Sequence, residues 1–129
     1  MASSCVLRAT GDNFQPSDFL RESTFEPCNV FRKDERKSAS SVWDTSGITV
    51  EVSSEDDFPA QVREAIIFLE TNRTELLRLK QFAGLKNLSL DFGVGGKDSF
   101  LQSYFFPLEI IHLASEFELE LEVSVYARN

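Results

Sequence analysis

The chain has 129 residues, of which 42% are apolar and twelve are Phe. That length is typical of one domain, and this apolar content can fill a core without disulfides or metal ions. The 13 Lys and Arg residues stand against 21 Asp and Glu residues, which gives a formal net charge of −8. Sequence-independent binding to phosphate backbones needs clustered positive charge, so we expect no nucleic-acid partner.

Cysteine usage and hydropathy indicate the cellular setting. Cys5 and Cys28 are the only cysteines, and they lack the CxxC spacing of a zinc site or redox motif. Neither a disulfide framework nor a cysteine metal site follows, and a reduced intracellular setting fits best. No apolar run approaches the roughly 18 residues of a membrane span, and no signal-peptide core follows Met1. We therefore expect a soluble, cytoplasmic protein without membrane contact.

The first half of the chain predicts strands and one short helix. Residues 5–10 alternate apolar and polar side chains, which is typical of a strand. Pro16 favours a short helix over residues 16–23. A strand is expected over residues 29–33, a polar hairpin loop over residues 34–41, and a clearly alternating strand over residues 48–52.

The second half predicts a long helix, two shorter segments and a final strand. Apolar side chains of residues 58–82 fall on one helical face, giving a helix of about 24 residues with a break expected at Thr71-Asn72. The further elements are a strand over 88–94, an extended segment over 100–106, a helix opened by Pro107 with apolar Leu108, Ile111, Leu113 and Phe117, and a strand over 119–125. In that strand the residues expected to face the helices are Leu119, Leu121, Val123 and Val125.

The element order β-α-β-β-α-β-(β)-α-β predicts one α+β domain over residues 1–129. Strands with one apolar and one polar face indicate a two-layer sandwich, in which helices cover one face of a mostly antiparallel sheet. The β-α-β-β-α-β part has the order of a ferredoxin-like split βαβ unit, extended by a C-terminal helix and strand.

Three short motifs resemble those of the bacterial domain-of-unknown-function family 4279. They are Gly11–Pro16 after the first strand, Phe31–Arg36 followed by Trp43, and Phe106–Ile111 continuing to Val125-Tyr126. The resemblance covers nearly the whole chain, although this chain has Asp34 where family members carry Gly. It implies an α+β fold and a mostly bacterial origin, and it implies no established activity. Some members resemble immunity proteins that neutralise secreted toxins.

Two features suggest catalytic or cofactor chemistry only superficially. His112 is the only His, and a nucleophilic triad or zinc site would need partners that the sequence does not place beside it, so we assign it to packing. Gly93–Ser99 partly resembles a phosphate-binding loop, but Asp91 and Asp98 stand where that template requires Gly and Ser or Thr. We expect a glycine-rich turn there, and neither a cofactor nor a metal ion.

A short basic segment interrupts the acidic chain. Its cations are Arg32, Lys33, Arg36 and Lys37. Asp34 and Glu35 divide them, and no series of aromatic residues for base stacking surrounds them. A solvated loop is therefore favoured over a phosphate or nucleic-acid contact.

The candidate site is a group of carboxylates on the polar side of the predicted sheet. It comprises Glu118, Glu120 and Glu122 on the last strand, with Asp91 and Glu51 on two other strands. Successive same-face residues of a strand lie about 7 Å apart, too far for adjacent carboxylates to share one metal ion. We interpret the group as a surface.

Three interpretations of this surface remain open. It can be an ordinary hydrophilic face, partly neutralised by Arg8. It can dock a basic protein, because an acidic field accelerates association with a cationic partner. It can also belong to a carboxylate-dependent hydrolase acting near Asp91 and Glu51, which would need one desolvated carboxyl group in a cleft. We favour a non-catalytic binding domain, resembling an immunity protein that blocks a basic toxin, and keep the hydrolase as the alternative.

Overall fold

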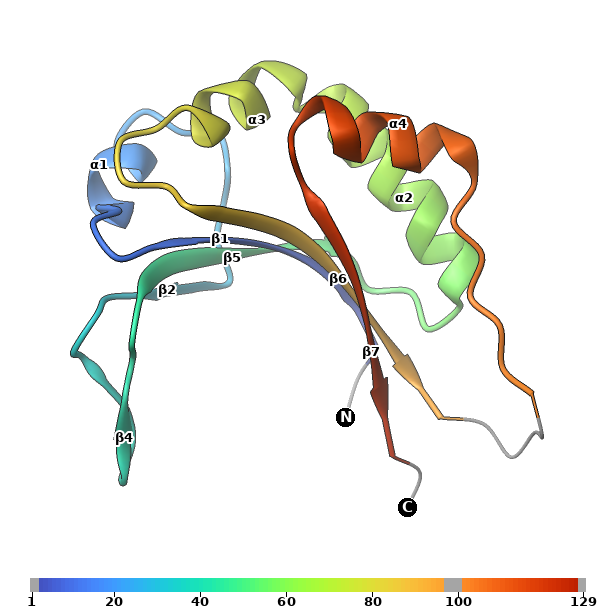
Figure 1. Ribbon diagram of the computed structural model, residues 1–129, viewed down its shortest axis with the longest axis horizontal. Helices are drawn as coiled ribbons and strands as arrows, with labels where there is room; N and C mark the ends of the chain where they lie inside the picture. Colours follow the sequence, from blue (N-terminus) through green and yellow to red (C-terminus); the bar gives the residue numbers. More distant parts are fainter. Residues whose placement is uncertain (1–2, 97–100, 128–129) are drawn as a thin grey trace.

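The computed structural model describes residues 3–96 and 101–127, which contain four helices and seven strands (Figure 1). The helices are α1 (Pro16–Leu20), α2 (Phe58–Thr71), α3 (Arg73–Lys80) and α4 (Leu108–Glu116). The strands are β1 (Cys5–Gly11), β2 (Asn29–Phe31), β3 (Arg36–Ser38), β4 (Ser41–Val42), β5 (Ser46–Ser53), β6 (Asn87–Gly95) and β7 (Glu120–Tyr126).

Five strands form one arched sheet in the order β2-β5-β1-β6-β7. β5 lies between β1 and β2 and pairs antiparallel with both, and β1 also pairs antiparallel with β6. Only β7 runs parallel to its neighbour, β6. The helices α2, α3 and α4 lie over the convex side, and no described helix covers the concave side, which we call the open face (Figure 1). The predicted α+β class is therefore confirmed.

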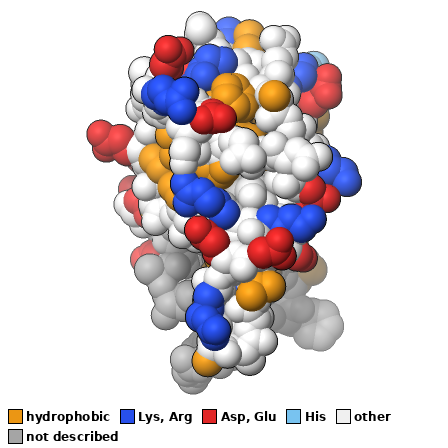
Figure 2. All heavy atoms as spheres, turned by 90° about the vertical axis from the view of Figure 1, so that its left-hand side faces the viewer, with side chains coloured by type: hydrophobic (Ala, Val, Ile, Leu, Met, Phe, Trp, Pro, Cys, Tyr) orange, Lys and Arg blue, Asp and Glu red, His pale blue; other side chains and the backbone are white. Residues whose placement is uncertain are grey.

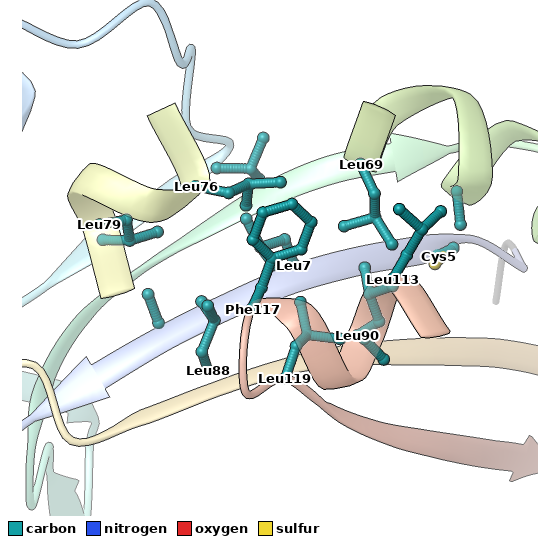
Figure 3. Close-up of a cluster of buried hydrophobic side chains, with 14 of the residues drawn as sticks. Cys5, Leu7, Leu69, Leu76, Leu79, Leu88, Leu90, Leu113, Phe117 and Leu119 are labelled. Atoms are coloured by element: carbon teal, nitrogen blue, oxygen red, sulfur yellow. The ribbon is translucent and has the colours of Figure 1, made fainter. Parts of the chain in front are cut away.

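The core lies between the convex side of the sheet and the helices. Cys5, Leu7 and Ala9 of β1 are completely buried, and alternate residues of β6 are buried beside them. Figure 3 shows Leu69 of α2 and Leu76 of α3 reaching toward these strands from above. Each fully buried Leu of this kind contributes roughly 1.5–3 kcal/mol through burial alone. The central strand β1 is thus fixed by packing as well as by two strand partners.

The long helix breaks where the sequence predicted. Asn72 has φ −107° and ψ 26°, outside helical values, and separates α2 from α3. Its side-chain amide donates to the carbonyl of Phe68 at 2.9 Å, a local bond that competes with the helical pattern. Leu69 and Leu76 are completely buried on the two sides of the break. The two shorter helices can therefore both follow the curved sheet.

Several predicted boundaries in the first half are wrong. The helix expected over residues 16–23 ends at Leu20, and the strand expected over residues 29–33 ends at Phe31. The expected polar loop contains a two-stranded hairpin, β3–β4. Backbone bonds between Asp34 and Trp43 (2.8 Å) and between Trp43 and Glu35 (2.9 Å) extend this hairpin toward the sheet. The sequence did not predict these strands, because their side chains are almost all polar and show no alternation of apolar and polar residues.

The extended segment expected over residues 100–106 can be compared with the structure only in part. Its described part, residues 101–107, forms neither helix nor strand, and residue 100 lies outside the described residues. The expected glycine-rich turn also falls partly outside them, because Gly93 and Gly95 belong to β6 and the described chain stops at Gly96.

Helix α4 buries a different stripe from the one predicted. Its buried residues are Ile110, Leu113 and Ala114, and Phe117, directly after the helix, is buried as well. The four residues are spaced as one helical face. Leu108 and Ile111, expected in the core, are exposed. His112 is exposed as well, so its assignment to packing is wrong.

Glu118 does not belong to the last strand, contrary to prediction. It has φ 52° and ends α4 in a Schellman motif, in which the N–H of Leu119 donates to the carbonyl of Ala114 at 2.8 Å. The N–H of Glu118 donates to Ser115 at 3.1 Å. Its carboxylate lies 3.1 Å from the ammonium group of Lys80, on the helical layer. Glu118 therefore caps a helix and leaves the candidate surface.

The remainder of the last strand agrees with its predicted phase. Leu119 is buried just before β7, and Leu121 and Val123 pack partly against the core. Val125 is 51% exposed. β7 is an edge strand, and Figure 1 shows its end extending beyond the helical layer, so this residue has little to pack against.

Replacing Glu118 with Gly should raise the free energy of unfolding by about 0.5–1 kcal/mol, because Gly adopts a positive φ without a Cβ clash. The exposed ion pair with Lys80 contributes little, so its loss offsets only part of the gain. Urea unfolding measures the difference. E118A is the control because it keeps the strain and loses only the ion pair. Equal stability of E118G and E118A would contradict this conformation.

A charged cluster fastens the loop after α1 to α3. The Glu75 carboxylate accepts hydrogen bonds from Arg78 (2.8 Å), from the hydroxyl of Ser23 and from the N–H of Thr24 (3.1 Å). Arg78 also donates to the carbonyl of Phe19 at 2.8 Å and lies over its ring. The hydrogen bond from Arg78, together with those from Ser23 and Thr24, lowers the pKa of Glu75.

Replacing Glu75 with Gln should lower the free energy of unfolding by about 1–3 kcal/mol at neutral pH. A carboxylate whose pKa is lower in the folded than in the unfolded state stabilises the fold above the unfolded pKa, about 4.3. That contribution disappears as the pH falls through the folded-state pKa. Urea unfolding across a pH series should therefore show wild type and E75Q converging in acid. A difference that stays constant down to the acid limit would contradict this role.

Candidate functional site

The sheet register brings four of the five predicted site residues together. Asp91 lies opposite Val6 of β1, which lies opposite Glu51 of β5, and Glu122 of β7 lies opposite Asp91. Glu120 occupies the next row on the same face, because side chains alternate along a strand. These residues form the acidic end of the open face, which we define as Glu51, Asp91, Glu120 and Glu122.

Arg8 neutralises the centre of this acidic end. Its guanidinium nitrogen Nη1 lies 3.2 Å from Asp91 Oδ2 and 3.9 Å from Glu122 Oε1. The hydroxyl of Ser124 donates to the other oxygen of Asp91 at 2.7 Å. The expected role of Arg8 is thus confirmed. Ser124 was missed, because nothing in its local sequence indicates that β7 pairs with β6.

Burial divides the four carboxylates into two kinds. The Asp91 side chain is only 9% exposed, and its carboxylate is bound by Arg8 and Ser124, so it is hardly accessible to a partner. Burial, together with the charge of Asp91 as the smaller cause, raises the pKa of the neighbouring Cys5 thiol. Glu51, Glu120 and Glu122 are exposed. The surface that a partner can contact is therefore less acidic than the sequence predicted, with three accessible carboxylates.

The opposite end of the open face is aromatic and basic. Phe31 stacks on Trp43 with ring centroids 4.1 Å apart, and the Lys37 ammonium lies 4.7 Å from the Trp43 centroid. Gly47 makes this possible, because a Cβ atom there would lie 2.7 Å from the Phe31 ring and 2.4 Å from the Ala9 carbonyl oxygen. The stack holds the end of the sheet against the hairpin.

We call residues 32–43 the basic hairpin. Its residues 32–42 are all exposed, as a solvated loop would be, but paired strands and the aromatic stack give it a defined structure. Figure 2 views the molecule from this side and shows Lys or Arg side chains beside hydrophobic ones toward its narrow lower end.

A groove of about 550 Å³ lies on the helical side, between the start of α2 and the segment that leads into α4. Its lining is mainly apolar and includes Phe58, Val62, Tyr104 and Phe105, with Asp57, Arg63 and Glu109 as charged members. The Asp57 carboxylate caps α2 by accepting from the N–H of Ala60 at 3.0 Å. None of the predicted site residues lines this groove. Phe105, which lines the groove, is 77% exposed, but in the sequence an apolar residue normally indicates a core, so the groove could not be predicted.

The described residues contain no group of three or more His, Cys, Asp or Glu side chains placed to hold a metal ion. No described helix is both long enough and apolar enough to cross a membrane. Chemically, the open face offers accessible carboxylates on paired strands at one end, and accessible cations on the hairpin and the turn before it at the other.

Replacing Arg8 with Met should lower the free energy of unfolding by about 1–3 kcal/mol, because it leaves the buried Asp91 carboxylate without its cation. Replacing Asp91 with Asn should cost less, since the Arg8 side chain is 40% exposed and water can hydrate it. The double variant R8M/D91N should cost less than the sum of the single variants. Urea unfolding of the four proteins tests this, and strict additivity would contradict coupling between the two groups.

Comparison with known proteins agrees with the resemblance in sequence. The model of the family described as Domain of unknown function (DUF4279) matches residues 1–128. No curated protein and no solved structure matches the chain. Because the family match covers nearly the whole chain, the resemblance that the three short motifs indicated is confirmed, and the protein belongs to the DUF4279 family.

Proposed function

We propose that this domain is a non-catalytic binding protein that docks a basic protein partner through the acidic end of the open face, in the manner of an immunity protein that inhibits a toxin. The observation that carries the proposal is the position of Glu51, Glu120 and Glu122. All three are exposed on one uncovered face, and paired strands hold their backbones. Two free cysteines, Cys5 and Cys28, fit a reduced cytoplasmic setting.

Electrostatics supports this mode of binding. An acidic surface steers a cationic partner and raises the association rate, an advantage that salt reduces. Glu51 and Glu120 make no ion pair with any described residue, so both charges remain for a partner. Carboxylates on a rigid sheet also lose little backbone entropy when a partner binds.

The hydrolase alternative has less support from the same residues. Paired-carboxylate hydrolysis needs two carboxyl groups flanking the substrate, with different environments. Asp91 is held by Arg8 and Ser124, and the strand β1 separates it from Glu51, which places their backbones about 10 Å apart. We therefore retain binding as the proposed function.

The charge-reversal variant E51K/E120K tests the proposal. Affinity capture from the native host, with tagged wild type as bait, should retain a basic protein in stoichiometric amount. The variant should retain much less of it, because two attractive charges become repulsive. Stopped-flow association with that partner should be slower for the variant by about tenfold or more at low ionic strength. Added salt should narrow the difference.

The matched control is E70K/E109K, which changes two exposed Glu residues of the helical layer by the same total charge. It should capture the partner as wild type does. Unfolding midpoints of both variants should stay near that of wild type, since exposed charges contribute little to stability. Equal capture and equal association rates for E51K/E120K and wild type would reject this face as the binding surface.

A further inference from the structure

We infer that the basic partner of this face is a second copy of the same chain. The two copies form a symmetric dimer in which the basic hairpin of each docks against the acidic end of the other. This inference rests on the proposed function, because it uses the same acidic residues and names what binds them. An external basic protein then competes with the second copy for one surface.

The charges that remain accessible at the two ends are complementary. In the basic hairpin, Lys33, Arg36 and Lys37 make no ion pair with a described carboxylate. Arg36 donates only to the backbone carbonyl of Ala39, at 3.2 Å. Arg32 is different, because it contacts Ser17 and lies 3.9 Å from Glu35. Among the described residues, three cations without an ion pair thus stand at one end of the open face, beside the exposed Asp34, and two carboxylates without an ion pair, Glu51 and Glu120, stand at the other.

The two ends lie at opposite limits of the same concave face. Phe31, which stacks on Trp43, pairs with Gly47 at one end of the sheet. Glu51 lies four residues further along β5, in the row of Asp91 and Glu122. Figure 1 shows the hairpin projecting from one side of the arch and the ends of β6 and β7 projecting from the other. Glu120 lies in the row of Arg8, on the edge strand β7 at the other side of the sheet from β2. The charge of the face therefore changes sign diagonally, both along the strands and from the β2 edge to the β7 edge.

A face with this polarity is self-complementary. When a twofold axis places two such faces against each other, the basic end of each copy meets the acidic end of the other. Every favourable contact is then made twice. The net charge of −8 on each copy opposes association, but at physiological ionic strength the Debye length is about 8 Å, so the contacting groups outweigh distant charges.

The hairpin also supplies apolar area and rigidity. Val42, which pairs with Arg36, is 55% exposed, and Trp43 is half-buried beside the Phe31 ring. Aromatic side chains and Arg are enriched at interface centres, and the hairpin offers both in Trp43 and Arg36. The stacked rings order the hairpin before it binds, which reduces the entropy lost on docking.

Sedimentation velocity of the full chain at physiological ionic strength tests the inference through a charge swap. Wild type should show a concentration-dependent shift from monomer to dimer. The face variant E51K/E120K and the hairpin variant K33E/R36E should each dimerise at least about tenfold more weakly, because each brings like charges together. An equimolar mixture of the two variants should restore the dimer. In the mixed dimer the reversed face of one variant meets the reversed hairpin of the other, and the two unchanged ends meet as in wild type, so both contacts join opposite charges.

The hairpin variant leaves Lys37 in place, so the contact with Trp43 is kept. The control E70K/E109K should dimerise as wild type does. Monomeric wild type throughout the concentration range, or a mixture that stays monomeric, would overturn the inference. Those results leave the proposed function intact if E51K/E120K still loses an external basic partner. Conversely, unchanged capture by E51K/E120K would reject this face as the site that binds an external partner, while the charge swap still reports on self-association.

Discussion

Burial of the inner side of β1 is the constraint on which the rest of the structure depends. Cys5, Leu7 and Ala9 have no exposed surface, and the alternation of a strand then directs Arg8 to the open face. Because β1 pairs with β5 and β6, its register also decides which of their side chains point outward. A slip by one residue would bury Arg8 and expose Leu7. The charge pattern of the open face is thus a consequence of packing on its other side.

A central cation changes what an acidic sheet face can do. Arg8 and Ser124 hold the Asp91 carboxylate in a nearly buried position, where an unpaired charge would be costly. The charges that matter for binding are therefore displaced to the periphery, at Glu51 and Glu120. These residues can exchange water for a partner without disturbing the internal network. Stability and recognition consequently rest on different carboxylates of one surface.

The basic hairpin shows how a few aromatic contacts give structure to a polar segment. Its strands are short and their side chains are exposed, so burial of the hairpin itself contributes little. The stack of Phe31 on Trp43, with Lys37 over the indole ring, connects it to the sheet. This connection places four cations, which outnumber the hairpin's two carboxylates Asp34 and Glu35, at the end of the open face opposite Glu51. One face then carries both signs, which is the physical basis of the inferred self-association.

The sequence by itself determined the layers of this protein. Alternation along the strands identified their inner and outer faces, the helical period identified the covering layer, and Asn72 marked the break between its helices, because these signals depend on neighbouring residues alone. Only the tertiary structure decided where elements end and which distant residues meet. Glu118 continues the alternation of the last strand in sequence, but it caps α4, because the helix must reverse there to bring β7 beside β6. Likewise, His112 is exposed and Asp91 meets Ser124 through the pairing of strands far apart in the chain, which no local pattern encodes.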